Sequence, residues 1–353
     1  MNVFIKLPSP NKAKMDIDQL MEADGFINIA VGVKGTGGVA RFMRKLLSVL
    51  NILFKVHRGD VVLIQYPFKK FYVMQCELAR LKGAKTITLI HDLGTFRRRK
   101  LTATQEMKRL SHTDHLIVHN ESMKRWLEEH GWNKGITCLE IFDYLVGEQG
   151  PQGAKNREHS KPRIVYAGGF GEKKSSFVYK IDKVMAGLEF QLYGKGETAG
   201  YAEYWDNVKY MGCLSSDELI RTVDADWGLV WDGDAVETLS GNWGEYLKLN
   251  NPHKTSFYLC AGLPVVMWTG SAMAPFILEH KLGITVDSLE ELPLKLIMMP
   301  KEEYKELKDS AVEFSEKLKS GYFFRKAFRA ALQYLGVRSD GEHLSLQLPL
   351  EHR

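Results

Sequence analysis

The sequence predicts an α/β protein built from two doubly wound domains. From the amino terminus onward, short β-branched runs alternate with longer amphipathic stretches, which is typical of a parallel sheet covered by helices. The alternation begins again after residues 147–162, a stretch of glycine, proline and polar residues that indicates a linker. The chain has 353 residues and a usual domain holds about 150, so the length also fits two domains.

The first predicted domain, residues 1–146, carries six expected strands. Several of them are largely apolar, as strands covered by helices on both faces are. The expected strands are residues 3–7, 26–29, 61–66, 86–91, 115–118 and 138–142. Helices are expected between them, for example over residues 39–56 and 121–129.

The second predicted domain, residues 163–320, repeats this pattern. Two capping boxes, Ser215 with Glu218 and Ser288 with Glu291, predict helix starts within it. Residues 337–353 show no periodicity and are predicted to be a tail. The expected strands are residues 164–167, 190–193, 208–211, 227–231, 264–268 and 284–286, and two helical stretches, residues 301–319 and 322–335, follow them.

Composition excludes several classes of protein. With 44% hydrophobic and 26% charged residues, the chain is predicted to be globular rather than disordered or fibrous. The longest run without charge, residues 255–278, is interrupted by glycines and prolines, so it does not predict a bilayer-spanning helix. The apolar patch near the amino terminus is too short for a secretory signal. Four scattered cysteines form no Cys-x-x-Cys pair, so neither a zinc site nor a disulfide framework is expected, and a cytoplasmic location is favoured.

The charge distribution does not predict nucleic-acid binding. The formal net charge of +5 is mild for this length. Two basic groups stand out, residues 97–100 and the set Arg325, Lys326 and Arg329. A solvated surface explains both groups, and the open alternative is contact with anionic lipid headgroups at the inner face of the membrane or with a lipid-phosphate substrate.

A candidate phosphate site lies in residues 250–265, which are predicted to run from a loop through a short helix into a buried strand. Pro252 suits a helix start, and the free backbone amides of Lys254, Thr255 and Ser256 would then point out of the helix. A helix start with a lysine and two hydroxyls is suited to bind phosphate. The alternative is that Lys254 is a solvated first-turn lysine, which is unfavourable against the helix dipole.

The same segment resembles a known family. Its helix, the sequence AGLPV at residues 261–265 and the following strand resemble the donor-binding segment of GT-B glycosyltransferases, which transfer a sugar from a nucleotide diphosphate. Residues 165–174 resemble the first strand and glycine-rich loop of that domain, with Lys173 and Lys174 at the end of the loop. Residues 192–197 resemble the next strand and turn, and residues 208–212 resemble the segment beside the nucleotide base.

Three further segments, residues 228–233, 240–247 and 251–256, resemble a narrower bacterial subfamily. This subfamily holds galactofuranosyltransferases and the glucosyltransferases that extend glycans on serine-rich adhesins. The resemblance implies a GT-B fold, in which two Rossmann-like domains face each other across a cleft, and a last helix, residues 321–336, that returns to the first domain. It implies a UDP-sugar donor, a hexose (galactofuranose, glucose or galactose) and a growing glycan acceptor that is lipid-linked or protein-linked.

The loops and the resemblance together give the expected site. The first group, in the second domain, is expected to bind the nucleotide and its phosphates: Gly169, Lys173, Tyr193, Gly194, Tyr210, Asn251, Lys254, Thr255 and Ser256. The second group is expected to contact the donor sugar or the acceptor: Thr36, Gly37, Gly38, Asp232 and Asn242.

One departure from the family pattern leaves the stereochemistry open. Many retaining GT-B enzymes have two glutamates eight positions apart, the second of which holds the nucleotide ribose. The matching positions here are Leu249 and Phe257. Glu237 and Glu245 show the spacing but are out of register, so we interpret them as a chance pair. Another group, among Tyr210, Asn251 and Ser256, must then hold the nucleoside.

The first domain offers a loop and a candidate base. The loop, residues 32–38, is rich in glycine and opens a predicted helix, so its amides could approach a phosphate or a sugar, although it could also be a simple connector. His91 ends a predicted strand and Asp92 follows it. The pair could deprotonate an acceptor hydroxyl as catalytic residues, or Asp92 could cap the next segment while His91 is a satisfied strand-end histidine.

The residues after the strand at 227–231 also have two interpretations. Asp232 and Asp234 could bind sugar hydroxyls or could form the turn. Their Asp-x-Asp spacing lies in the wrong domain for a metal-dependent sugar transferase, so no metal is expected. Trp243 could stack on a sugar face or pack into the core.

Two rival functions remain open at this stage. A catalytically silent GT-B subunit would bind nucleotide weakly and need a second chain. A sugar-nucleotide epimerase shares the two-domain architecture and would release free sugar. No feature of the sequence fixes the number of chains in a homo-oligomer.

Overall fold

The structure is a computed structural model, and it describes residues 1–96, 99–147, 159–196 and 205–337. For Lys69, Glu172 and Lys173 only the backbone is described. The chain divides into two compact units. Unit 1 holds Met1–Leu139 and the segment that starts at Gly321, and unit 2 holds Glu140–Ser320. Each unit contains a six-stranded sheet, so the predicted α/β class is confirmed.

Unit 1 is built on a sheet with the strand order β2-β1-β3-β4-β5-β6, in which every neighbouring pair is parallel. Its core gathers the apolar side chains of the central strands, such as Val62, Ile64 and Leu116, all of them buried. The strands are β1 (Asn2–Phe4), β2 (Ile27–Asn28), β3 (Val61–Tyr66), β4 (Lys85–Ile90), β5 (His115–Val118) and β6 (Gly135–Cys138). The helices are α1 (Lys12–Ala23), α2 (Gly38–Leu50), α3 (Ile52–Lys55), the 3-10 turn η1 (Lys69–Phe71), α4 (Tyr72–Leu81), α5 (Ala103–Leu110), α6 (Glu121–Glu129) and α14 (Tyr322–Tyr334).

The sixth strand lies earlier in the chain than the sequence predicts. The expected strand was residues 138–142, whereas β6 ends at Cys138. Glu140 has a φ of 70°, which is left-handed and incompatible with an extended strand. The apolar residues Ile141 and Phe142 are nevertheless buried, which explains why their pattern resembles a strand.

Unit 2 has the strand order β12-β11-β10-β7-β8-β9, again with parallel neighbours throughout. Both predicted helix starts are capped, but only Ser288 and Glu291 make the full, reciprocal capping box. At the other start the Ser215 hydroxyl accepts from the Glu218 amide, which is the serine half of the predicted box. The strands are β7 (Arg163–Gly169), β8 (Glu189–Lys195), β9 (Val208–Gly212), β10 (Trp227–Val230), β11 (Val265–Trp268) and β12 (Gly283–Val286). The helices are α7 (Glu172–Ser175), η2 (Ser176–Tyr179), η3 (Ile181–Val184), α8 (Ser216–Thr222), α9 (Gly241–Tyr246), α10 (His253–Cys260), α11 (Ala274–Glu279), η5 (Leu289–Glu291), α12 (Leu292–Ile297) and α13 (Lys301–Ser320).

Both sheets have a point where the strand order reverses. In unit 1 the first strand, β1, lies between β3 and β2. In unit 2 the first strand, β7, lies between β10 and β8. Ligands of open parallel sheets bind at the carboxyl ends of the strands at this reversal. A ligand site of unit 2 is therefore expected at the carboxyl ends of β7 and β10.

The last helix, α14, belongs to unit 1. It packs against β5 and β6, and its Phe328 ring lies 5.0 Å from the ring of Phe26. Arg325 donates to both carboxylate oxygens of Asp24 at the end of α1, with nitrogen–oxygen distances between 2.7 and 3.0 Å. No helix within the described ranges is long and apolar enough to cross a membrane.

Candidate active site

A cluster of charged and aromatic side chains lies at the carboxyl ends of β7 and β10. Lys254, in the first turn of α10, donates to Asp232 Oδ1 over 3.1 Å and to the backbone oxygen of Trp231 over 3.3 Å. The Lys174 ammonium, on α7, lies 4.0 Å from the same carboxylate oxygen. The side chains of Lys254 and Asp232 are only 11% and 9% exposed. The fold thus brings a buried ion pair to the reversal point of the sheet.

Tyr166 forms the floor of this cluster. The Lys254 ammonium lies 4.1 Å from the centre of the Tyr166 ring, which is a cation–π contact. The Tyr166 hydroxyl donates to Ser175 Oγ over 2.7 Å and lies 3.5 Å from Asp232 Oδ1. Burial, together with the charge of Asp232, raises the pKa of Tyr166 well above its ordinary value, so the phenol stays neutral.

Two ammonium groups of the cluster face the same carboxylate. Lys254 Nζ lies 3.1 Å and Lys174 Nζ lies 4.0 Å from Asp232 Oδ1. Lys174 also lies 5.3 Å from the centre of the Trp243 ring on α9. Two ammonium groups so close together are suited to an anion, because charges interact more strongly at a partly buried site than in water.

The turn after β10 separates Asp232 from Asp234. Gly233 has a φ of 117°, and an added Cβ would lie 2.7 Å from the backbone oxygen of Ser240, so the turn requires glycine. Asp232 is buried against the two lysines, whereas Asp234 is exposed. The Asp234 carboxylate accepts from the Ser240 hydroxyl, and its backbone oxygen accepts from Lys180. Asp234 therefore holds the turn together.

The three other expected residues around the start of α10, namely Asn251, Thr255 and Ser256, are buried. Thr255 is buried, and its hydroxyl has no hydrogen-bond partner among the described residues. The Ser256 hydroxyl donates to the backbone oxygen of Phe142 over 2.6 Å, and Asn251 Nδ2 donates to that of Glu140 over 2.9 Å. Asn251 and Ser256 thus tie the first residues of unit 2 to the start of α10.

The expected nucleotide residues of β7 to β9 lie along one edge of the sheet. Gly169 ends β7 and pairs with Lys195 on β8. The Tyr210 hydroxyl donates to the backbone oxygen of Gly194 over 3.0 Å, and its ring is exposed. Tyr193 is buried, and burial raises its pKa. Lys173 lies outside the described side chains.

Of the five expected sugar and acceptor residues, Asp232 belongs to the lysine cluster described above, and the remaining four lie in two places. Asn242 is exposed at the start of α9, next to Trp243. The other three, Thr36, Gly37 and Gly38, are exposed in the glycine-rich loop of unit 1, where Gly37 caps α2. Arg44 on α2 donates to the backbone oxygens of Val33 and Gly35 over 2.7 and 3.1 Å, so this loop is held in place.

His91 and Asp92 follow β4 in unit 1. His91 is buried and its Nε2 lies 2.7 Å from Gln65 Oε1. Asp92 is half-buried. Both residues therefore lie at the carboxyl edge of their sheet, where parallel sheets bind ligands.

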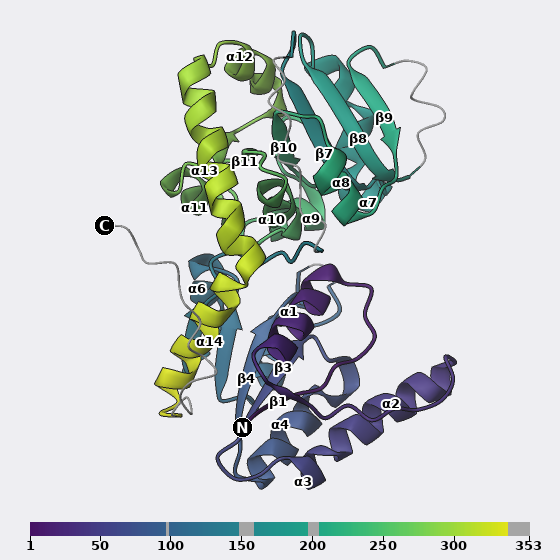
Figure 1. Cartoon of the computed structure of the whole chain (residues 1–353), viewed down its shortest axis with the longest axis vertical. Coiled ribbons are helices and arrows are strands. Elements are labelled where there is room, and N and C mark those ends of the chain that lie inside the picture. Colours follow the sequence, from purple (N-terminus) through teal and green to yellow (C-terminus); the bar gives the residue numbers. More distant parts are fainter. Residues whose placement is uncertain (97–98, 148–158, 197–204, 338–353) are drawn as a thin grey trace. The chain divides into compact units, whose positions relative to one another are not determined.

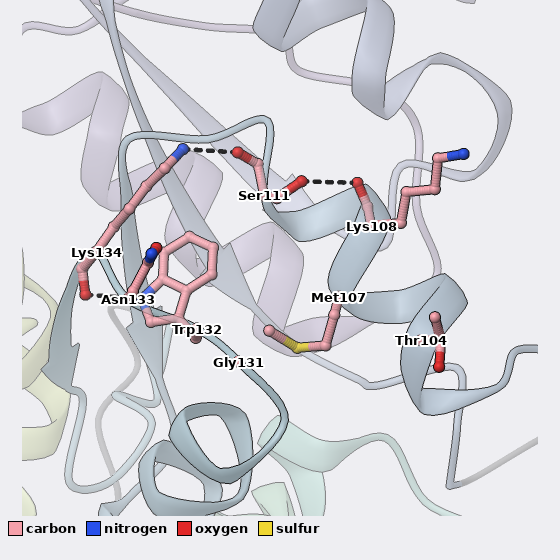
Figure 2. A pocket seen from close by; sticks show the side chains of 8 residues that line it. All are labelled: Thr104, Met107, Lys108, Ser111, Gly131, Trp132, Asn133 and Lys134. Carbon is pink, nitrogen blue, oxygen red and sulfur yellow. Dashed lines mark hydrogen bonds between the residues drawn. The ribbon is translucent and has the colours of Figure 1, made fainter.

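A hollow of about 310 Å³ lies elsewhere in unit 1, between α5 and the loop that precedes β6 (Figure 2). Lys134 crosses it and donates to the backbone oxygens of Ser111 and Thr113. These residues precede β5 and β6, so the hollow lies at the amino ends of the strands. This edge is opposite to the one that binds ligands in such sheets. Within the described ranges, no group of three or more His, Cys, Asp or Glu side chains could hold a metal ion.

Family models match both halves of the chain. The glucosyltransferase 3-like N-terminal domain matches residues 8–141, and the glucosyltransferase 3-like C-terminal domain matches residues 164–331. The chain belongs to the glucosyltransferase 3-like family. Beta-1,6-galactofuranosyltransferase WbbI of Escherichia coli (strain K12) is 32% identical to it over 327 residues, 91% of this chain and 94% of that relative. Glucosyltransferase 3 of Streptococcus gordonii is 28% identical over 285 residues, 78% of this chain and 80% of that relative.

Solved structures show the same fold for this glucosyltransferase 3-like protein. The apo lipopolysaccharide outer core galactosyltransferase WaaB aligns with a TM-score of 0.60 at 10% identity, covering 94% of this chain and 98% of WaaB. Anabaena Alr3699/HepE in complex with UDP also gives a TM-score of 0.60 at 10% identity, covering 95% of this chain and 99% of HepE. The predicted GT-B fold and the predicted family are confirmed, and the chain is a glycosyltransferase.

The sequence does not predict three residues of the cluster, Lys174, Tyr166 and Ser175, as site residues. For Lys174, which lies in the glycine-rich motif, the signal is its positive charge next to Lys173. Tyr166 and Ser175 gave no signal, because a tyrosine inside an apolar strand has the pattern of a core residue. The contacts of Tyr166 with Lys254 and of Ser175 with Tyr166 become visible only in the structure, where α7, β7, β10 and α10 lie next to one another.

Proposed function

We propose that this glucosyltransferase 3-like protein transfers a hexose, either galactofuranose, glucose or galactose, from a UDP-sugar to a growing glycan. A galactofuranosyltransferase and a glucosyltransferase among the relatives support a hexose donor. The UDP bound to HepE supports uridine diphosphate as the carrier. The acceptor glycan is lipid-linked or protein-linked.

The observation that carries the donor site is the convergence of two ammonium groups, Lys254 and Lys174, next to Asp232 at the carboxyl ends of β7 and β10. In this proposal the two lysines bind the diphosphate, and they stabilise it as it leaves, without a metal ion. Asp232 holds the Lys254 ammonium at the carboxyl edge of β10. A chelator is expected to leave turnover unchanged.

The nucleoside is assigned to the edge formed by β7, β8 and β9. Of the three residues expected to hold it, Tyr210 has an exposed ring, whereas the Asn251 and Ser256 side chains bind backbone oxygens. We therefore assign the uridine to Tyr210, with Gly169 and Gly194 allowing close approach of the backbone. Asn251, Thr255 and Ser256 shape the start of α10. Thr36, Gly37, Gly38 and Asn242 are assigned to the sugar and acceptor.

A nucleotide panel tests the donor assignment. Melting temperatures are measured with UDP, GDP, ADP and TDP at equal millimolar concentration. A ligand at 100 times its dissociation constant adds about 2.7 kcal/mol to the free energy of unfolding, and this raises the melting temperature by several degrees. We expect a shift with UDP and a smaller one or none with the others. No shift with UDP would contradict the proposal and favour a silent subunit.

Product analysis separates the transferase from an epimerase. UDP-galactofuranose, UDP-glucose and UDP-galactose are each incubated with the protein and a glycan acceptor. A transferase releases UDP in step with a lengthened acceptor. Release of free epimerised sugar without lengthening would contradict the proposal.

We further propose that the protein works in the cytoplasm, peripherally at the inner face of the membrane, and that α2 makes the contact. Figure 1 shows α2 projecting from unit 1. Val39 on α2 and Phe54 on α3 are 79% and 75% exposed, and Phe42 is also exposed. Lys34 and Arg41 add exposed positive charge beside them. A basic, amphipathic helix with aromatic residues is suited to an anionic lipid surface.

Vesicle sedimentation tests this contact. Binding to vesicles with phosphatidylglycerol, and weaker binding to pure phosphatidylcholine, is expected for the wild type. The change Phe42→Ser is expected to weaken it, whereas Leu294→Ser, on exposed α12 of unit 2, serves as the control. Equal binding of all variants would contradict the proposal. Concentration-dependent association without lipid, abolished by Phe42→Ser, would instead assign the surface to a second copy of the chain.

A further inference from the structure

A chain of hydrogen bonds connects Asp18, Gln65 and His91 in unit 1. Gln65 lies on β3, Asp18 lies on α1, and His91 follows β4 directly. Gln65 Nε2 donates to Asp18 Oδ1 over 2.7 Å, and Gln65 Oε1 lies 2.7 Å from His91 Nε2. Asp18 and His91 are only 4% and 7% exposed. This series of hydrogen bonds therefore lies away from bulk water.

The partners of Gln65 fix the orientation of its amide. The amide nitrogen also faces the backbone oxygen of Lys14 at 3.4 Å, and a carbonyl oxygen can only accept. Turning the amide over would place its oxygen against that carbonyl and against the Asp18 carboxyl. Burial raises the pKa of Asp18 to about 7, but the Lys14 carbonyl requires the same orientation even when Asp18 is protonated.

This orientation determines the tautomer of His91. The Gln65 oxygen faces Nε2, so Nε2 must carry the hydrogen of that bond. The other ring nitrogen, Nδ1, is buried. A general base must come within hydrogen-bond distance of the proton that it removes. Neither nitrogen of His91 is open to a substrate hydroxyl, whereas the neighbouring Asp92 is half-buried.

We propose that Gln65 and Asp18 hold His91 in its neutral Nε2–H form, and that His91 positions Asp92, which is the base. The His91 backbone amide also donates to the Tyr66 oxygen over 2.9 Å, so both parts of His91 anchor the end of β4. The assignment of Asp92 rests on the proposed function. In the transfer step, the acceptor oxygen bonds to the anomeric carbon and its proton passes to the Asp92 carboxylate. The bond from that carbon to the diphosphate breaks, and its electron pair leaves on UDP.

The tautomer is tested by nitrogen NMR of protein labelled with ¹⁵N-histidine, at pH 7.5. The His91 signals are assigned by their loss in His91→Gln. We expect the pattern of a neutral ring with hydrogen on Nε2 in the wild type and a mixture of tautomers in Gln65→Leu. The control is Asp16→Asn, a buried carboxylate of the same helix that pairs with Lys12 and should not change the His91 signals. A protonated ring or a wild-type ring with hydrogen on Nδ1 would overturn the proposal.

Activity separates a positioning histidine from a base. UDP release is measured with UDP-galactofuranose and UDP-glucose, with folding checked by circular dichroism. His91→Leu is expected to lower kcat. His91→Gln keeps a hydrogen-bond donor near the position of Nε2, so its kcat is expected to lie within about threefold of the wild-type value. Loss of a general base, by contrast, lowers the rate about 10²- to 10⁴-fold. Asp92→Asn is expected to show the larger loss. A His91→Gln loss as large as that of Asp92→Asn would make His91 the base and overturn the proposal.

The two readouts distinguish this inference from the proposed function. If the wild type releases no UDP from any UDP-sugar, the proposed function fails, yet the NMR experiment still decides the tautomer. If the wild type is active and His91 carries its hydrogen on Nδ1, the inference alone fails.

Discussion

Single residues in this protein are constrained most strongly where two strands approach each other at the carboxyl edge of a sheet. Gly194 on β8 has a φ of 143°, and an added Cβ would lie 1.7 Å from the backbone oxygen of Gly168 on β7. Gly212, at the end of β9, also has a positive φ, 88°, but an added Cβ would meet nothing within 4 Å. A side chain at Gly194 would therefore meet both backbone strain and a steric conflict with β7, whereas a side chain at Gly212 would meet backbone strain alone.

We predict that Gly194→Ala lowers the free energy of unfolding by more than about 3 kcal/mol, because a backbone atom must move. Gly212→Ala should cost only about 1 to 2 kcal/mol, the cost of a left-handed L-residue. Urea denaturation of both variants measures the difference. Equal effects would show that the approach of β7 and β8 at Gly168 is not tight.

At the scale of single elements, α14 shows how a distant segment completes unit 1. Arg325 uses two nitrogens to hold the Asp24 carboxylate at the end of α1, and the side chains are only 13% and 4% exposed. Removing one partner of a buried pair leaves the other charge without compensation.

We therefore predict that Arg325→Met lowers the free energy of unfolding by about 3 kcal/mol. Arg325→Lys should recover only part of this, since an ammonium group cannot bind both oxygens in the same planar arrangement. Urea denaturation is the measurement, and Lys305→Met on α13, an exposed pair with Asp309, is the control. A loss no larger than that of the control would show that the contact is solvated in solution.

The bounds of the strands and helices show how much of the fold the sequence predicts. Apolar runs located most strands to within a residue or two, because strands buried on both faces need continuous apolar side chains. The exception inside the first sheet is β1, which ends at Phe4 rather than at the predicted residue 7. The pattern was wrong for β6, where the left-handed Glu140 ends the strand although the next residues stay apolar. It also missed α9, a short helix with two glycines, whose N-cap residue Ser240 donates its hydroxyl to Asp234 in the turn after β10.

The candidate site was only partly predictable for a similar reason. Lys254 could be found because a lysine in a first helical turn opposes the helix dipole and requires an explanation. Tyr166 could not be found, since a buried tyrosine in a strand gives no sign that a lysine 88 positions later lies over its ring. Gln65 and Asp18 have no local motif either, because the bond between them joins residues 47 positions apart.

At the scale of the whole molecule, buried histidines make stability depend on pH. Burial lowers the pKa of His115 and of His119 to about 4. Between that value and the ordinary pKa of about 6.5, the unfolded chain binds protons that the folded protein does not. The free energy of unfolding contributed by these groups therefore falls as the pH falls through this range. Asp18 acts in the opposite direction, because its pKa is raised to about 7.

We predict that the destabilisation caused by His119→Gln is smaller at pH 5 than at pH 7.5, by about 2 kcal/mol. At pH 5 the unfolded wild type binds a proton at His119 that the folded protein does not bind, so the wild type loses stability. The His119→Gln variant has no imidazole at this position and does not lose this part of its stability. Urea denaturation at both pH values measures the difference, and His57→Gln, at an exposed position, is the control. A difference equal to that of the control would contradict the buried, neutral state of His119.

The central claim is that the Lys254 cluster binds the diphosphate of UDP. Titration calorimetry with UDP and with uridine, on the wild type, Lys254→Met and the exposed control Lys248→Met, tests it most directly. A charge-assisted hydrogen bond is worth about 1.5 to 3 kcal/mol, so Lys254→Met should weaken UDP binding about tenfold or more. Uridine binding and the control should stay unchanged. Equal UDP affinity in the wild type and in Lys254→Met would contradict the claim.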